Sequence, residues 1–295
     1  MNICIVGSFP YHLECIGFLL EIFSNIGVNI YIHVASDSFN YLKHYNEIYD
    51  FYISKNLSPE ILNKYDKIIK LSSNDPVLDN NNILSIVHLF SLKDKSKNKK
   101  YLSLTPYING ENIYNTFPVY RPNIVFNKNK TVIFIGYYKS ENIDNDMVNF
   151  ININKSYKFR FIIRGSPNYN RLKGLNNVEL LTNIQANTLA NLINESKYIL
   201  SKKIINYDRF SGQLGLSISF EKPLLIDIKT KKDYNLPGIS FNNDYSELGD
   251  LDNICDNTYK RLINEIKNKK EEIITSNKAI FSNHIINISQ ISQIM

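Results

Sequence analysis

The chain has 295 residues, of which 43% are hydrophobic, and a formal net charge of +6. This length is long for one domain and comfortable for two, and the apolar content is enough for a packed core in each. The charge is spread along the chain without a recognisable nucleic-acid-binding module or an alternation of basic and aromatic residues, which argues against a nucleic-acid partner. A mildly positive cleft would instead suit an anionic small molecule such as a nucleoside diphosphate.

The sequence shows no sign of insertion into a membrane or of export. No apolar run approaches the roughly 18 residues that a membrane-spanning helix needs. No basic region precedes the first apolar run at residues 3–6, so we expect no signal peptide. The three cysteines, Cys4, Cys15 and Cys255, lack metal-ligand spacing, and their odd number is typical of reduced thiols. We expect a cytoplasmic protein with no integral membrane segment, for which peripheral membrane contact stays open.

The first third of the chain alternates strand and helix. An apolar strand at residues 2–7 leads into Gly7, apolar residues recur at helical spacing over residues 16–26, and a second strand follows at residues 29–35. Strand, helix and strand in this order form a βαβ unit, which implies a parallel sheet. Further strands are predicted at residues 67–71, 83–90 and 101–105.

The same alternation restarts after a stretch rich in proline. Residues 106–129 lack sustained periodicity, which is typical of a crossing between domains. Beyond it, strands are predicted at residues 132–136, 159–164, 178–181, 198–201 and 223–228, with helices between them. We therefore predict an α/β protein with two doubly wound sheets. Its predicted parts are an N-terminal domain at residues 1–122, a second domain at 123–250, and C-terminal helices at 251–295 that could pack back on the first domain.

One loop offers a site for an anion. Residues 202–210 join a predicted strand to a predicted helix, and Ser211 and Gly212 open that helix. A helix N-terminus presents unpaired N–H groups and a partial positive charge, and a glycine there lets a phosphate approach the backbone. Ser211 could cap the helix or donate its hydroxyl to a phosphate oxygen. An ordinary capped helix in an ordinary sheet is an equally good interpretation of the local sequence.

Residues 208–226, DRFSGQLGLSISFEKPLLI, resemble the diphosphate-binding segment of GT-B glycosyltransferases of the family 4-like kind. In that family a loop of small residues opens a helix, and a basic-Pro turn leads to the next apolar strand. Residues 177–200 are similar to the family's base-binding strand and the strand after it. The resemblance covers residues 130–240 and implies two Rossmann-like domains that face each other across a cleft. It also implies transfer of a sugar from a nucleoside-diphosphate sugar, with UDP or GDP, to an acceptor hydroxyl.

The resemblance assigns donor-binding roles residue by residue. Basic residues that follow two of the family's strands reach the donor diphosphate, and two cations from neighbouring strand ends would also stabilise a pyrophosphate leaving group on physical grounds. Many retaining members carry one Glu at the start of the segment and a second inside it. This chain has Asp208 and Gln213 nearby, so retention or inversion stays open. The implied diphosphate contacts are Lys139, Arg164, Arg209, Ser211, Gly212 and Gln213, and the implied base contacts are Asn183 and Ile184. For Lys139 and Arg164, the alternative is a solvated surface cation.

The acceptor and a general base would belong to the N-terminal domain. Gly7 and Ser8 leave room for a ligand after the first strand, and His12 lies just beyond. An inverting enzyme needs a base with a pKa near 7 to deprotonate the acceptor hydroxyl. His12 and Asp208 are the catalytic candidates, while His88 is either an acceptor-side residue or a core residue of its apolar strand. The acceptor could be a glycan, a lipid or a protein.

Two short acidic patterns, Asp144-Asn145-Asp146 and Asp250-Leu251-Asp252, match the pair of carboxylates that holds a divalent metal in the other glycosyltransferase architecture. Both fall at predicted helix starts, where Asp caps well. We interpret both as helix caps. The sequence therefore predicts a metal-independent protein without a cofactor, for which the nucleotide-sugar is a substrate.

Two other classes of protein stay open. A non-catalytic relative would keep the fold and bind the nucleotide-sugar without transferring the sugar. A dinucleotide-dependent oxidoreductase would need Gly-x-Gly-x-x-Gly after a strand. Gly7 and Gly136 both lack the glycines that should follow, and Asp37, after the second strand, is the residue that supports this alternative.

Overall fold

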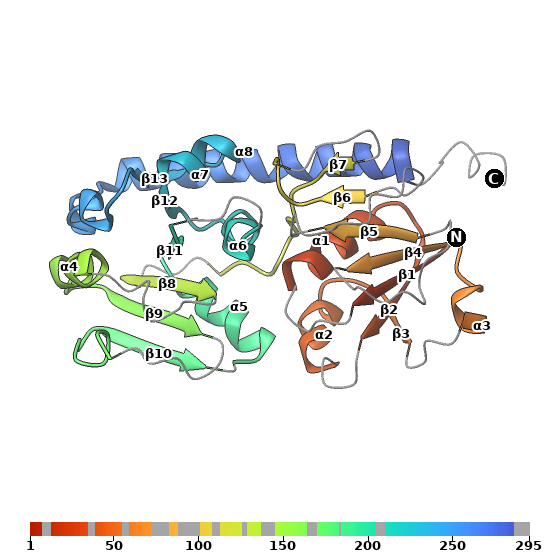
Figure 1. The fold of residues 1–295 in the computed structure, drawn as a ribbon, viewed down its shortest axis with the longest axis horizontal. Helices are drawn as coiled ribbons and strands as arrows, with labels where there is room; N and C mark the ends of the chain where they lie inside the picture. The colour runs from red at the N-terminus through yellow and green to blue at the C-terminus, as the bar shows by residue number, and fades with distance from the viewer. Residues whose placement is uncertain are drawn as a thin grey trace. The chain divides into compact units, whose positions relative to one another are not determined.

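The computed structural model describes residues 1–7, 13–34, 39–54, 59–71, 83–87, 101–107, 113–125, 129–136, 145–163, 170–182, 184–203 and 210–285. The chain divides into two compact units (Figure 1). Unit 1 contains Met1–Arg121, Asn206–Phe210 and Glu271–Met295, and unit 2 contains Pro122–Ile205 and Ser211–Lys270. Each unit is built on its own parallel sheet, as the two βα alternations of the sequence predict.

Unit 1 contains a sheet in the order β3-β2-β1-β4-β5-β6-β7, in which neighbouring strands run parallel. The central strand β1 is apolar without alternation, as expected for a parallel strand that is buried on both faces; Ile3, Cys4 and Ile5 are all fully buried. The strands are β1 (Asn2–Gly7), β2 (Asn29–Val34), β3 (Tyr52–Ser54), β4 (Lys67–Leu71), β5 (Ile83–Val87), β6 (Tyr101–Ser103) and β7 (Ile113–Asn115). The helices between them are α1 (Leu13–Ser24), α2 (Phe39–Asn46) and α3 (Pro59–Leu62).

The proline-rich stretch at residues 106–129 is not only a crossing, because β7 lies within it. Three residues, Ile113 to Asn115, pair in parallel with β6 and extend the sheet of unit 1. The prediction of a crossing between domains did not include this strand. A strand of three residues is too short to show the alternation on which that prediction depends.

Unit 2 contains a sheet in the order β10-β9-β8-β11-β12-β13, again with parallel neighbours. The sequence predicts at least five strands there, and the described residues form six. The strands are β8 (Thr131–Gly136), β9 (Lys158–Ile163), β10 (Val178–Thr182), β11 (Tyr198–Leu200), β12 (Leu224–Asp227) and β13 (Gly238–Phe241). The helices are α4 (Asn145–Ile153), α5 (Ala186–Asn194), α6 (Gly212–Ser219) and α7 (Ile228–Asp233), with short 3₁₀ turns η4 (Tyr245–Leu248) and η5 (Leu251–Asn253).

The core of unit 2 is rich in aromatic side chains. Phe134 from β8, Phe159 and Phe161 from β9, and Phe150 from α4 are each at most 2% exposed. Phe150 meets Phe159 edge to face, with ring centroids 5.7 Å apart. This is a favoured arrangement of two aromatic rings, and it fixes α4 against the sheet.

The chain ends in helix α8 (Asp256–Ile280), which continues into a π-helical turn, η6 (Phe281–Ile285). Residues up to Lys270 belong to unit 2, and residues from Glu271 onward belong to unit 1. Within unit 1, the buried ring of Phe281 meets Phe18 and Phe23 of α1 edge to face, at 5.8 and 5.5 Å between centroids. None of the helices in the described part of the chain is long and apolar enough to span a membrane.

Candidate functional site

The strand order of unit 2 reverses between β8 and β11. From β8 the chain builds β9 and β10 on one side, then returns to add β11, β12 and β13 on the other side. In open α/β sheets, ligands bind in the crevice outside the carboxyl ends of the strands at such a switch point. The candidate ligand-binding residues are therefore Gly136 at the end of β8, residues 201–203 after β11, and the start of α6.

The first turn of α6 is open to an anion. Ser211 is the N-cap residue and has extended backbone angles, but its side chain makes no capping hydrogen bond. By contrast, α7 is capped by Asp227, whose Oδ1 accepts a hydrogen bond of 2.8 Å from Thr230 N. Ser211 and Gly212 are both partly exposed. Because the first N–H groups of a helix have no partner within it, this end of α6 can receive a phosphate oxygen.

A buried amide lies at the switch point itself. Gln213, the second residue of α6, is only 3% exposed, and its Oε1 accepts a hydrogen bond of 3.2 Å from Lys202 N after β11. Its Nε2 is buried and has no hydrogen-bond partner. A Cβ atom added to Gly136 would lie 3.9 Å from this Nε2. The Gln213 amide therefore lies between the ends of β8 and β11.

The backbone conformation at position 136 favours a glycine. Its φ of +147° is one that side-chain-bearing residues rarely adopt. A glycine here also leaves free the space next to the Gln213 amide. The end of β8 is therefore shaped for close approach of another group to the backbone.

A cluster of charges lies beside the switch point. Lys203 Nζ lies 3.3 Å from Asp146 Oδ2, 3.6 Å from Asp244 Oδ1 and 4.7 Å from the ring centroid of Tyr245. Asp146 also accepts hydrogen bonds from the backbone N–H groups of Tyr245 and Ser246. Burial alone would raise the pKa of Asp146, but these N–H donors and Lys203 outweigh it and hold the pKa below its usual value. The cluster fixes the residues after β11 against η4.

The two acidic patterns are engaged by the protein itself. Asp250 caps η5, since its Oδ1 accepts a hydrogen bond of 2.9 Å from Asp252 N. Asp252 pairs with Lys130 at 2.7 Å and accepts a hydrogen bond from Ser156. Asp146 differs from the prediction, because it lies within the first turn of α4 and receives the N–H groups of η4 rather than capping its own helix. Asp144 lies outside the described residues, and metal independence stays a prediction.

The structure brings together part of the predicted set. Ser211, Gly212 and Gln213 lie together at the start of α6. Ile184 follows the end of β10, at the same edge of the sheet but on its outermost strand. Gly7 ends β1 in unit 1, between Val34 of β2 and Leu71 of β4, where the strand order of that sheet reverses as well. The remaining predicted site residues lie outside the described part of the chain: Ser8, His12, His88, Lys139, Arg164, Asn183, Asp208 and Arg209.

The Lys203 cluster is not among the sites that the sequence predicts. Lys203, Asp146 and Tyr245 are far apart in the chain, by 57 and 42 residues from Lys203. No local pattern marks such a contact, because it exists only once β8, β11, β12 and β13 have assembled into one sheet.

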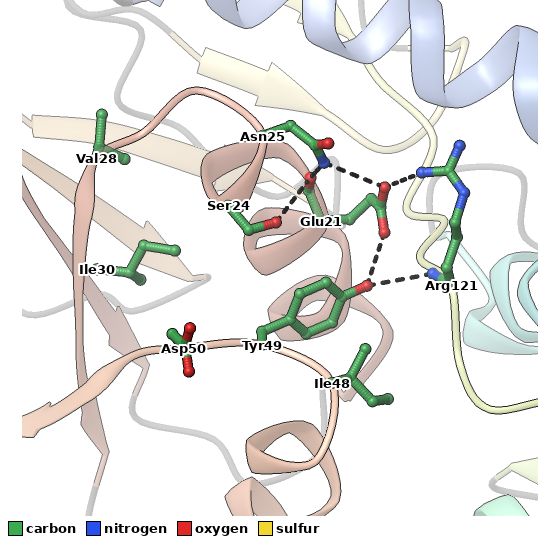
Figure 2. A pocket seen from close by; sticks show the side chains of 9 residues that line it. All are labelled: Glu21, Ser24, Asn25, Val28, Ile30, Ile48, Tyr49, Asp50 and Arg121. Atoms are coloured by element: carbon green, nitrogen blue, oxygen red, sulfur yellow. Dashed lines mark hydrogen bonds and ion pairs between the residues drawn. The ribbon is translucent and has the colours of Figure 1, made fainter.

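Unit 1 contains a pocket of about 470 Å³, shown in Figure 2. It lies at the amino ends of β2 and β3 and at the C-terminal end of α1, on the side of the sheet opposite to the carboxyl ends. Ligands of open α/β sheets bind at the carboxyl ends, so this position argues against a substrate site. The lining residues are Glu21, Ser24, Asn25, Val28, Ile30, Ile48, Tyr49, Asp50 and Arg121.

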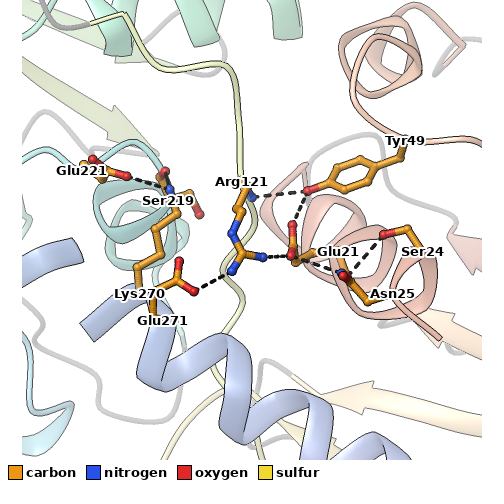
Figure 3. A network of polar contacts seen from close by, with 9 residues as sticks. All are labelled: Glu21, Ser24, Asn25, Tyr49, Arg121, Ser219, Glu221, Lys270 and Glu271. Atoms are coloured by element: carbon orange, nitrogen blue, oxygen red, sulfur yellow. Dashed lines mark hydrogen bonds and ion pairs between the residues drawn. The ribbon is translucent and has the colours of Figure 1, made fainter. Parts of the chain in front are cut away.

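The wall of this pocket is a polar network that stabilises unit 1 (Figure 3). Glu21, only 3% exposed, pairs with Arg121 through Oε1 and accepts a hydrogen bond of 2.7 Å from Tyr49 Oη through Oε2. Burial, followed by the charge of Glu21, raises the pKa of the Tyr49 hydroxyl. Arg121 also pairs with Glu271 of α8 at 2.6 Å. The buried carboxylate is thus fully engaged.

We expect Arg121→Met to destabilise unit 1 by about 2 kcal/mol, because it leaves the buried Glu21 carboxylate without its cation. Glu271→Gln is the matched control on the same arginine. The Glu271 side chain is 60% exposed against 4% for Glu21, so its loss should cost less than about 0.5 kcal/mol. Urea unfolding of the variants measures both. Equal losses in the two variants would contradict a larger contribution of the Glu21–Arg121 pair.

No family model matches the chain, and no curated protein sequence matches it. Solved structures do match in fold. Anabaena Alr3699/HepE, solved with UDP-glucose, matches with a TM-score of 0.61 at 10% identity, covering 95% of this chain and 98% of that one. The UDP-GlcNAc 2-epimerase of Neisseria meningitidis, bound to UDP-GlcNAc, matches at 0.55 and 13% identity, with 94% and 99% covered. S. aureus MnaA, solved with UDP, matches at 0.54 and 14% identity, with 97% and 98% covered.

These likenesses extend over both units and show the architecture. The chain has an α/β fold of the GT-B type, with two Rossmann-like domains. The fold class predicted from the sequence is thereby confirmed.

Proposed function

We propose that the chain binds a nucleoside-diphosphate sugar at the switch point of unit 2 and transfers its sugar to an acceptor hydroxyl. The observation that carries the proposal is the start of α6, where N–H groups that Ser211 does not cap lie beside the unpaired amide of Gln213. Both are hydrogen-bond donors, as a diphosphate requires. The solved structures of similar fold, with UDP-glucose, UDP-GlcNAc and UDP, support the same class of ligand.

In this proposal unit 2 binds the donor and unit 1 binds the acceptor. The N–H groups of the first turn of α6 hold the diphosphate, with Lys139, Arg164 and Arg209 as further cations. Asn183 and Ile184, after β10, receive the base. Gly7, Ser8 and His88 belong to the acceptor side. His12 and Asp208 are the proposed catalytic residues, with His12 as the base that deprotonates the acceptor hydroxyl.

A second candidate function is inversion of the sugar at C2. It is favoured by the likeness in fold to the Neisseria meningitidis UDP-GlcNAc 2-epimerase, which spans nearly the whole of both chains. Such an enzyme would act on the nucleotide-sugar without an acceptor and would leave the bond between sugar and diphosphate intact at the end of the reaction. Transfer, by contrast, breaks this bond and releases the nucleoside diphosphate.

The two activities can be separated with UDP-GlcNAc and UDP-glucose as substrates. We expect UDP to be released faster when a mixture of glycan, lipid and peptide acceptors is present, as followed by anion-exchange chromatography. A new UDP-sugar that forms from UDP-GlcNAc without any acceptor, with no UDP released, would instead establish the epimerase. Binding of UDP-sugars without either reaction would establish the non-catalytic relative.

A further inference from the structure

The amide of Gln213 has a fixed orientation. Its Oε1 accepts the hydrogen bond from Lys202 N at 3.2 Å. A backbone N–H can only donate, so the oxygen of the amide must face Lys202 and the NH₂ group must face the other way. The NH₂ group is therefore the end that approaches Gly136. At this position the side chain can give a hydrogen bond but cannot accept one.

The buried NH₂ group of Gln213 destabilises the protein unless an acceptor forms a hydrogen bond with it. Gln213 is 3% exposed, and its Nε2 has no partner. Burying an amide N–H without an acceptor costs on the order of 1–3 kcal/mol, and nearly all buried polar groups in proteins are paired. An unpaired donor at the switch point of an open α/β sheet is most simply completed by a ligand that brings an acceptor oxygen.

A phosphate bound at the start of α6 would lie close to the Gln213 amide. Ser211 and Gly212, which precede Gln213 in the chain, are partly exposed at the same end of α6. A phosphate that accepts from the N–H groups of this turn carries further oxygens, each able to accept another hydrogen bond. Gly136 has no side chain that would separate such an oxygen from the Gln213 amide.

We propose that Gln213 Nε2 donates a hydrogen bond to a diphosphate oxygen of the ligand, while Gln213 Oε1 holds the backbone of Lys202. Gln213 then links the ligand to the segment after β11, and through Lys203 to η4. The inference rests on the proposed function, because it needs a nucleoside diphosphate at α6. The inference adds Gln213 Nε2 as an atom that binds the diphosphate. It also predicts that replacing this donor with an acceptor weakens the binding of the diphosphate.

The chain offers a sharp spectroscopic test, because it contains four glutamines: Gln185, Gln213, Gln290 and Gln293. In protein labelled with ¹⁵N only at glutamine, we expect UDP to shift the side-chain NH₂ signals of Gln213, assigned through its own backbone amide. Uridine, which lacks the diphosphate, should leave them in place. The spectrum with uridine serves as the reference.

A pair of variants tests the same contact by affinity. Gln213→Glu keeps an oxygen for Lys202 N and exchanges the donor for an acceptor, so UDP affinity measured by calorimetry should fall at least tenfold. Asn187→Asp is the matched control, because it makes the same amide-to-carboxylate change at the second residue of the neighbouring helix α5, on an exposed side chain. It should change the affinity less than twofold.

The outcomes separate the inference from the proposed function. If the wild-type protein binds no UDP, both fail. If it binds UDP while the Gln213 signals stay in place, or while Gln213→Glu binds as tightly as the wild type, nucleotide binding stands and the role of Gln213 is wrong. Should Gln213→Glu not fold, the spectrum of the wild-type protein decides alone.

Discussion

Ser211→Asp should weaken the binding of UDP and of UDP-sugars at least tenfold. Ser211 is the N-cap of α6 and makes no capping hydrogen bond with its side chain, so the N–H groups of the first turn are left to a ligand. An aspartate at this position would accept from those N–H groups itself, since it is among the best N-cap residues. It would also place a negative charge against the diphosphate. Both effects act in the same direction.

The control for this variant is Ser211→Ala, which removes the hydroxyl without adding a charge or a competing acceptor. We expect it to retain most of the UDP affinity in calorimetry, because the backbone N–H groups of α6 are unchanged. Since Asp is a better cap than Ala, Ser211→Asp should unfold no earlier than Ser211→Ala. Unchanged affinity for UDP in Ser211→Asp would show that the diphosphate binds elsewhere.

Lys222→Met should remove a rise in stability that the wild-type protein shows above pH 8. Lys222 is 2% exposed and donates one hydrogen bond of 2.7 Å from Nζ to Asn194 O. Burial lowers its pKa from 10.5 to about 8, against a smaller opposite effect of Glu221. Between these two values the unfolded chain holds the proton and the folded chain has released it. The free energy of unfolding therefore rises with pH across this window and carries the full penalty of the buried charge below about pH 8.

The size of this rise is measurable. A shift of one pKa unit corresponds to about 1.4 kcal/mol, so the wild type should gain about 2 kcal/mol over Lys222→Met between roughly pH 8 and pH 9.5. Urea unfolding at several pH values gives the difference. Lys232→Met, which removes an exposed lysine of α7, should keep the wild-type dependence on pH. Parallel curves for the wild type and Lys222→Met would contradict a buried, destabilising charge at this position.

The sequence predicts the fold where the apolar pattern is long. The strands at residues 2–7 and 132–136 and the helix that begins at Gly212 are recognised because their buried faces are continuous. The elements that escape prediction are short or polar. The helix α7, IKTKKD, has no apolar periodicity and is held by its Asp227 cap, and β13 begins with a glycine. The strand β13 forms because the neighbouring strand β12 supplies its hydrogen-bond partners, which no local pattern records.

The candidate site is predictable to a lesser extent. The position of Ser211 and Gly212 at a helix start follows from the sequence, since small residues there precede an apolar run. The orientation of the Gln213 amide does not, because it depends on Lys202, which follows β11 and is 11 residues away in the chain. The contacts of Asp146 do not follow from the sequence either. Its acidic pattern predicts a cap on its own helix, whereas its carboxylate accepts hydrogen bonds from the N–H groups of η4.

A crystal structure with UDP-GlcNAc or UDP-glucose would show whether a nucleoside-diphosphate sugar binds at the switch point of unit 2. We predict diphosphate oxygens within hydrogen-bond distance of the N–H groups of Gly212 and Gln213 and of Gln213 Nε2, with the base beside Ile184. A nucleotide bound at the amino ends of the strands, in the pocket beside Glu21, or in unit 1 alone would contradict it.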